Sequence, residues 1–443
     1  MRWTEGARLN ILYELTYATR GNSGIPRDTL AVAKILQADP KFHTDFLLNP
    51  KGLTYRGKLI PKKEKWASVD LGNALRKEPG RSVLPRLFQT PLLALQAISL
   101  FPSVIPFSVG KALRNETFAH LNMPQSPSSI SRIFLIPMSY AARFARPGFL
   151  PPFKIRKSEL DIFIQQQVDP IAVPKSVTHI VRLHDFLPIT HPQFFDDMAV
   201  KLFSKSLRIM LKGHKKTWVM DSQASAELFK ASFGEDLDVR VIPCAVMLGD
   251  RDFNSITKQK QILVLNTIEP RKRVMLAIEG FKRAKNQGLL DHDWKLVIAG
   301  GEGWQEKNLA SKLRKFGFGH DVIFSDSPTD FEVKTLLAES QILLSTSAAE
   351  GFGLPPLEGM AFGCVPVISD IPQHRETVGE HGFYFDGTKA VEVANALGLA
   401  AEKAATGGPD LISKLQEHVE KHFSFETITA QWDELLGSIR SKK

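Results

Sequence analysis

Two carboxylates frame a glycine-rich stretch in the second half of the chain. Glu350 and Glu358 are separated by seven residues, which include two glycines and two adjacent prolines. The apolar run before Glu350 predicts a buried strand, and Pro355 and Pro356 suit the first turn of a helix, where a missing N–H costs nothing. The stretch therefore predicts a strand, a loop whose backbone a ligand can approach closely, and a helix N-terminus that favours an anion.

The two carboxylates are too far apart to share one proton. At about 1.5 Å of rise per helical residue, and more in the loop, they should lie on the order of 10 Å or more apart. That separation suits the two ends of one long ligand with an anion held between them, as in a sugar nucleotide. A tight turn with a solvated glutamate at each end is the alternative that the spacing leaves open.

Two further stretches place polar side chains where a predicted strand gives way to a helix. Arg271 and Lys272 follow a strand predicted over 261–266, and two cations in such a loop offer a site for a diphosphate. His184 follows a strand predicted over 178–183, at the carboxyl end where parallel sheets place ligands. A neutral histidine there can bind a sugar hydroxyl, and a satisfied loop histidine is the alternative.

The first predicted strand, over 10–15, also leads into a glycine loop and then a helix. The loop carries Asn22, Ser23 and Gly24, and the helical pattern runs over 28–36. Glycine permits positive φ and close approach of a substrate. These three residues are therefore part of a second candidate ligand loop.

Strands and helical patterns alternate in both halves of the chain, which predicts an α/β protein with two doubly wound parallel sheets. Its 443 residues suit two or three domains, and the polar, turn-rich stretch after Gly249 predicts the linker. We expect an N-terminal domain over 1–252 with an insertion at about 50–175, a C-terminal domain over 253–422, and a last amphipathic helix within 423–443.

The net charge of +10 is concentrated in residues 1–220, whereas residues 221–443 are acidic overall. The first half is therefore expected to face an anionic membrane or a phosphate-bearing acceptor, and nucleic acid ranks last because no nucleic-acid module is recognisable. The two cysteines, Cys244 and Cys364, lie in apolar contexts that favour buried free thiols. With no signal-peptide pattern behind Met1, we expect a cytoplasmic setting.

Residues 87–110 carry no charged side chain, and their length would just span a bilayer. Three prolines argue against a clean membrane-spanning helix. A helix docked on the first domain is the simplest interpretation, and an amphipathic element dipping into the membrane is the alternative, favoured by flanking basic residues.

The motifs resemble those of a known family. Glu350 and Glu358 around Gly-Phe-Gly-Leu-Pro are similar to the signature of retaining glycosyltransferases of family four, which have the GT-B fold of two Rossmann-like domains facing a cleft. His-Asp-Phe-Leu-Pro at 184–188 resembles that family's His-Asp-Leu-Ile-Pro-Leu motif, and residues 266–273 resemble its Gly-Thr-x-Glu-Pro-Arg-Lys-Asn motif. The glycine loop over 20–27 matches the family's loop only in part, and the resemblance implies that Asn22, Ser23 and Gly24 form an acceptor and phosphate loop. The resemblance implies that the last helix crosses back onto the first domain.

The resemblance also implies roles for single residues. Glu358 would hold the ribose, Glu350 would hold sugar hydroxyls and steady positive charge on the ring, and His184 would orient the donor sugar or the acceptor. Donor binding without a metal or other cofactor would fall to Lys272, Arg271, Gly351, Phe352, Gly353 and Leu354. The family's usual Gly-Arg is Asn266-Thr267 here, which leaves the second phosphate-binding cation to Arg271.

The expected activity is transfer of a hexosyl unit from a nucleotide-diphosphate sugar to a glycan or lipid-linked acceptor. The Thr-x-Glu-Pro-Arg-Lys pattern resembles mannosyl and rhamnosyl transferases of bacterial surface polysaccharides, which favours GDP-mannose as the donor. A catalytically silent GT-B protein that binds a nucleotide sugar or a partner glycosyltransferase is the alternative. A phosphorylase-like enzyme with pyridoxal phosphate is a third class, which would need a much longer chain.

Overall fold

The computed structural model describes residues 8–15, 24–48, 107–108, 133–135, 153–154, 160–166, 168, 171–213, 215–247, 253, 256–301 and 320–441. Asn22 and Ser23 of the candidate loop lie outside the described residues, as do residues 87–106 and 109–110 of the charge-free segment. Among the described residues, no helix has the length and apolar character needed to cross a membrane.

The first domain is built on an eight-stranded sheet in the order β10-β9-β8-β6-β1-β2-β4-β3. Its pairings are parallel except that of β3 with β4. The strands are β1 (Leu9–Glu14), β2 (Phe42–Leu48), β3 (Phe107–Ser108), β4 (Ile133–Leu135), β6 (Ile162–Gln165), β8 (Thr178–Leu183), β9 (Thr217–Met220) and β10 (Asp238–Val241). A separate parallel pair joins β5 (Phe153–Lys154) to β7 (Ile171–Ala172).

Three strands of this sheet, β3, β4 and β6, fall inside the region expected to be an insertion, and β6 is central to the sheet. The apolar run of β6 lies between β1 and β8 and is fully buried on both faces, as central strands of parallel sheets are. Residues 162–165 therefore belong to the framework of the first domain.

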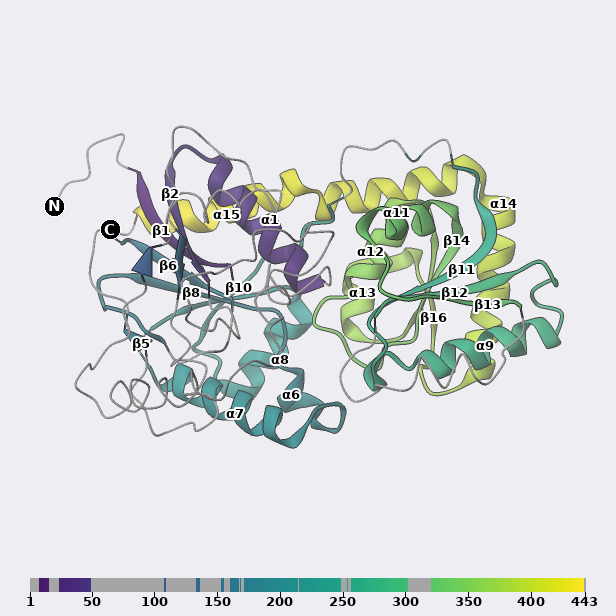
Figure 1. The fold of residues 1–443 in the computed structure, drawn as a ribbon, viewed down its shortest axis with the longest axis horizontal. Coiled ribbons are helices and arrows are strands. Elements are labelled where there is room, and N and C mark those ends of the chain that lie inside the picture. Colours follow the sequence, from purple (N-terminus) through teal and green to yellow (C-terminus); the bar gives the residue numbers. More distant parts are fainter. Residues whose placement is uncertain are drawn as a thin grey trace, which may run out of the picture.

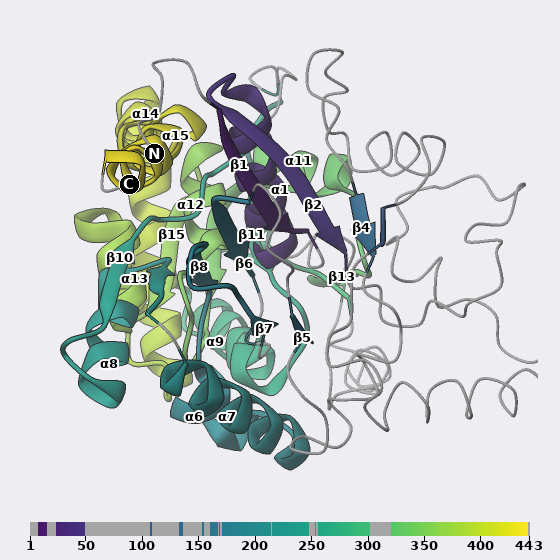
Figure 2. The same cartoon turned by 90° about the vertical axis from the view of Figure 1, so that its left-hand side faces the viewer.

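The helices of the first domain connect its parallel strands. They are α1 (Gly24–Ala38), α6 (Leu187–Thr190), the 3₁₀ turn η2 (Pro192–Phe194), α7 (Asp197–Lys212) and α8 (Gln223–Phe233). Asp196 caps α7 and Ser222 caps α8, each accepting backbone N–H groups of the first turn. Figure 2 shows α6, α7 and α8 together at one end of this domain.

The second domain has a six-stranded, wholly parallel sheet in the order β13-β12-β11-β14-β15-β16. Its strands are β11 (Gln259–Leu265), β12 (Lys295–Ala299), β13 (Val322–Ser325), β14 (Ser340–Ser345), β15 (Val365–Ser369) and β16 (Phe383–Phe385). Its helical segments are η3 (Pro270–Lys272), α9 (Val274–Asn286), α11 (Asp330–Glu339), α12 (Leu354–Ala361), α13 (Pro372–Val378), η4 (Gly379–His381) and α14 (Ala390–Phe423). The two parallel sheets confirm the α/β, doubly wound architecture.

The last helix, α15 (Phe425–Ser441), leaves the second domain and lies against the first, as Figure 1 shows. Ile428, Trp432 and Leu436 are completely buried in the cluster formed by β1, β2 and α1. The chain therefore completes the core of its first domain only with its last residues. Within α14, Gly408 has φ +53° and Pro409 follows it, which kinks that helix.

Candidate active site

Two loops leave the same edge of the second sheet and are bonded to each other. β11 and β14 are adjacent and parallel, so their carboxyl ends lie together. The Thr346 hydroxyl donates to the carbonyls of Lys272 and Arg273, at 2.8 and 3.1 Å. The Ala348 N–H donates to the Arg271 carbonyl at 2.8 Å. These bonds fix the two cations beside the loop that carries Glu350.

Glu350 is held between those two cations. Its Oε1 accepts from Lys272 Nζ at 2.5 Å and its Oε2 from Arg271 Nη1 at 2.8 Å, and all three groups are largely buried. Burial acts to raise the pKa of Glu350, but Lys272 and Arg271 outweigh it and hold that pKa well below its usual range. Burial lowers the pKa of Lys272 despite the carboxylate beside it. The carboxylate is therefore ionised at every physiological pH.

Gly351 lies where the two domains touch. A Cβ built on it would lie 2.3 Å from the carbonyl oxygen of His184 and 3.0 Å from Asp185 Cβ. The hydroxyls of Ser222 and Ser225, at the start of α8, each donate to the Gly351 carbonyl at 3.0 Å. Any side chain at this position would push the first domain away from the second.

Two helix N-termini converge next to this contact. α12 begins after Gly353, which has φ +94° and offers no side-chain cap. α1 begins at Gly24, where an added Cβ would lie 3.9 Å from Leu354 Cδ2. Neither helix has an acidic residue in its first turn. With Lys272 and Arg271 on the neighbouring loop, the partial positive charges of both helix ends make this a candidate anion site.

Glu358 lies on α12 and is buried, with 9% of its surface exposed, as Glu350 is at 8%. The alternative of two solvated carboxylates is therefore wrong. Glu358 Oε1 accepts from Arg27 Nη1 of α1, and Arg27 Nη2 also pairs with Asp330 Oδ1 at 3.3 Å. The carboxylate of Glu358 is the main cause that raises the pKa of Arg27.

His184 is buried inside the first domain. Its Nδ1 lies 3.0 Å from Asp221 Oδ2 and its Nε2 2.7 Å from Gln166 Oε1, so both partners are acceptors. Burial acts to lower the pKa of His184, but Asp221 and Asp28 outweigh it and raise that pKa. These contacts favour the imidazolium, whereas the sequence suggested a neutral ring. The part of His184 that meets the glycine loop is its backbone carbonyl.

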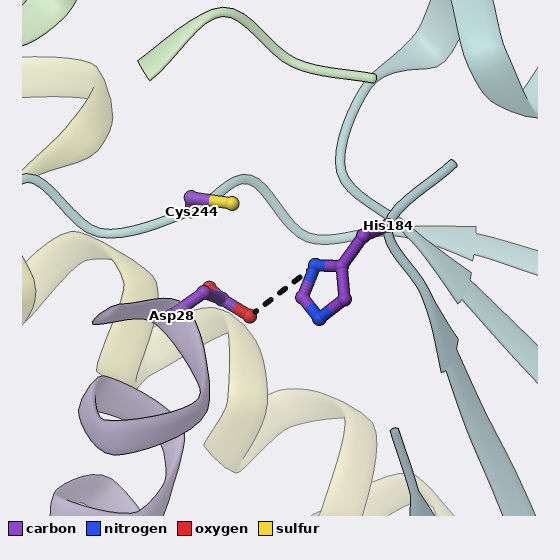
Figure 3. A group of neighbouring side chains, drawn as sticks. All are labelled: Asp28, His184 and Cys244. Carbon is purple, nitrogen blue, oxygen red and sulfur yellow. Dashed lines mark ion pairs between the residues drawn. The ribbon is translucent and has the colours of Figure 1, made fainter. Parts of the chain in front are cut away.

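Figure 3 shows Asp28, His184 and Cys244 pointing toward one another. Their ligand atoms lie within 4.8 Å of each other, the spacing expected of a metal site. However, Arg182 Nε and Nη2 donate to the two oxygens of Asp28 at 3.1 and 3.0 Å, and Nη2 lies 3.8 Å from the Cys244 sulfur. Because this buried guanidinium already neutralises the cluster, the arrangement fits a structural ion-pair network better than a cation site.

The sequence pointed to the two carboxylates, the two cations and the glycine loop as candidate site residues. It did not point to the residues from other segments that contact them. Arg27 could have been found because it is the last residue of the glycine loop over 20–27. His374, which packs against Gly353 and bonds the Ser369 carbonyl through Nδ1 at 2.8 Å, carried no such signal. Nor did Gln166 and Asp221, which hold His184.

Comparisons with known proteins show a family match over the second domain. Residues 250–405 match the family described as glycosyl transferases group 1. The serotype-specific mannosyltransferase WbdA of Escherichia coli is 25% identical over 274 residues, which cover 54% of this chain and 33% of WbdA. The GDP-mannose:cellobiosyl-diphosphopolyprenol alpha-mannosyltransferase of Komagataeibacter xylinus is 31% identical over 254 residues, covering 53% of this chain and 62% of that protein. This chain thus spans about a third of WbdA.

Solved structures extend the similarity to the whole fold. The crystal structure of Anabaena HepE in complex with UDP-glucose has a TM-score of 0.60 and 15% identity, and covers 97% of this chain and 100% of HepE. At this identity the match shows the shared GT-B architecture alone. The motifs, the fold and the family match together place residues 250–405, the core of the second domain, in the group 1 glycosyl transferases of glycosyltransferase family four.

Proposed function

We propose that this protein is a retaining hexosyltransferase that uses a nucleotide-diphosphate sugar, with GDP-mannose as the favoured donor. A glycan or lipid-linked hydroxyl would be the acceptor, in the synthesis of a bacterial surface polysaccharide. The observation that carries the proposal is the anion site, where Lys272, Arg271 and the N-termini of α1 and α12 surround the glycine loop.

The chemistry requires that charge on the leaving diphosphate be stabilised as the glycosidic bond breaks. Lys272 and Arg271 would supply two fixed cations, and the first-turn N–H groups of α12 have no partner within the helix. Glu350 stays ionised because of these cations, so it can accept sugar hydroxyls and stabilise positive charge on the ring. Glu358 would accept the ribose hydroxyls at the other end of the donor.

Mannose is favoured by the relatives rather than by a contact in the structure. Both curated relatives described above are named mannosyltransferases, and one is named for GDP-mannose. The base of the donor and the acceptor are not encoded in the side chains of the anion site, because that site addresses the diphosphate and both sugars.

A thermal-shift panel of GDP-, UDP-, ADP- and dTDP-sugars tests the proposal. We expect GDP-mannose to raise the unfolding temperature most, and Lys272→Met to abolish the rise by removing a phosphate contact. Lys260→Met is the matched control, because Lys260 lies at the opposite end of β11 in an exposed pair with Asp291. A panel in which no nucleotide sugar stabilises the unchanged protein would overturn the proposal.

Binding without turnover would instead indicate the catalytically silent alternative. Slow hydrolysis of the bound donor separates the two, because it needs no acceptor and releases free hexose. We expect the unchanged protein to release free mannose from GDP-mannose and Glu350→Gln to release it about a hundredfold more slowly, since charge stabilisation at the ring would be lost.

A further inference from the structure

The ribose-binding carboxylate of the proposed donor site is already occupied by the protein itself. Glu358, on α12 of the second domain, accepts from Arg27, on the first turn of α1 in the other domain. The side chains are 27% and 11% exposed for Arg27 and Glu358, so the pair is shielded from water and from salt. An ion pair with this burial is stronger than a typical surface pair.

The position of α1 leaves few other acceptors within reach of Arg27. Its helix starts against Leu354, the first residue of α12, so its first turn faces the first turn of α12. The only other carboxylate bonded to Arg27 in the described part of the chain is Asp330, at 3.3 Å, on the first turn of α11. Asp330 is 64% exposed, and therefore holds the guanidinium more weakly than Glu358 does.

We propose that Arg27 competes with the donor ribose for Glu358, and that donor binding requires Arg27 to give up this carboxylate. The inference rests on the proposed function, because it takes the ribose to bind at Glu358. Arg27 Nη1 already occupies Oε1 of Glu358, and a vicinal diol that donates to both carboxylate oxygens would meet the guanidinium there. Arg27 then keeps Asp330 as its remaining partner, so displacement does not leave it unpaired.

A purely structural role for Arg27 predicts something different. If the pair only ties the two domains together, removing Arg27 or Asp330 loosens the contact between the domains and changes nucleotide affinity in the same direction. Competition instead predicts changes in nucleoside affinity of opposite sign for the loss of Arg27 and the loss of Asp330. Losing Arg27 frees Glu358 and strengthens ribose binding, whereas losing Asp330 leaves Arg27 with Glu358 alone and weakens it.

The test measures nucleoside and nucleotide affinity in three full-length variants. Guanosine and uridine, followed by ligand-observed NMR, report the ribose contact without a phosphate, and GDP and UDP are titrated by calorimetry in parallel. We expect Arg27→Gln to bind the preferred nucleoside about threefold more tightly and Asp330→Asn to bind it more weakly. Arg240→Gln, which removes an exposed pair with Asp238, should leave affinity unchanged.

Unchanged or weaker nucleoside binding by Arg27→Gln would overturn the competition, provided that its unfolding temperature matches that of the Arg240→Gln control. If Arg27→Gln does not fold, Asp330→Asn decides the question. A nucleoside affinity of Asp330→Asn equal to or above that of the unchanged protein would overturn the inference. If the unchanged protein binds none of the four ligands, the proposed function is overturned as well. That outcome is distinguishable from failure of the competition alone, in which the unchanged protein still binds.

Discussion

At the scale of single residues, the site depends on charges that burial makes strong. Glu350, Lys272 and Arg271 carry one negative and two positive charges in a region with little water. Glu269 also accepts from Arg271, at 2.6 Å, so two carboxylates balance the two cations, and the helix N-termini supply the remaining positive charge that a diphosphate would compensate. The residue types alone indicated this chemistry, but only the structure shows that Glu350 binds both cations at once.

His184 makes a pH-dependent contribution whose sign follows from its partners. Because its pKa is raised in the folded protein, its stabilisation is fully present below its unfolded pKa, near 6.5, and is lost as the pH rises through the higher folded value. We expect this contribution to the free energy of unfolding to fall as the pH rises above about 6.5.

Urea unfolding of the unchanged protein and of His184→Gln at several pH values checks this expectation. The difference in stability between them should shrink with rising pH, because the variant lacks the titrating ring. His292→Gln is the control, since that imidazole is 91% exposed. A difference that stays constant from pH 6 to 9 would contradict a protonated His184.

At the scale of the elements, the contact between the glycine-rich loop and the first domain depends on the absence of a side chain at Gly351. We expect Gly351→Ala to separate the domains, because its Cβ would lie 2.3 Å from the His184 carbonyl oxygen. It should also break the hydrogen bonds of Ser222 and Ser225 to the Gly351 carbonyl. Turnover should fall about a hundredfold through misplacement of reacting groups.

Small-angle scattering and activity measure this effect together. The radius of gyration should rise in Gly351→Ala and stay the same in Gly437→Ala, where an added Cβ on α15 meets nothing within 4 Å. A Gly351→Ala protein with unchanged dimensions and full activity would show that the domain contact is not needed.

The elements were easier to predict than the contacts between them. The strand–loop–helix units around 178–188, 261–274 and 342–361 follow from local apolar runs, glycines and prolines. Arg27–Glu358 and Gly351–His184 join residues far apart in sequence, and their distances depend on how two domains face each other. No local pattern carries that information. The sequence did not predict β6, because its four residues are too few to establish a strand pattern within a long region that has no clear periodicity.

At the scale of the whole molecule, the first domain depends on the end of the chain. Trp432 of α15 is completely buried, and the guanidinium carbon of Arg182 lies 5.8 Å from its ring centroid. We expect Trp432→Ala to lower the free energy of unfolding by about 3–5 kcal/mol, through the cavity and the lost contact with Arg182. Chemical denaturation measures this, with Leu399→Ala as a control, since Leu399 on α14 is 58% exposed.

The charge asymmetry also belongs to this scale, and it concerns residues that the structure does not describe. The basic excess of residues 1–220 and the charge-free segment over 87–110 predict contact with an anionic membrane or a lipid-linked acceptor. Aspartate at both Leu93 and Leu100 should reduce binding to anionic vesicles in a sedimentation assay. Unchanged partitioning would favour a helix docked on the first domain.

The central claim is that a nucleotide-diphosphate sugar binds with its ribose on Glu358 and its diphosphate at the convergent helix ends. Calorimetric titration of GDP-mannose into the unchanged protein and into Glu358→Ala tests it most directly. The account predicts saturable binding at one site per chain and an affinity at least about tenfold lower in the variant, since two hydrogen bonds to a charged group are lost. Equal affinity in the two proteins would contradict it.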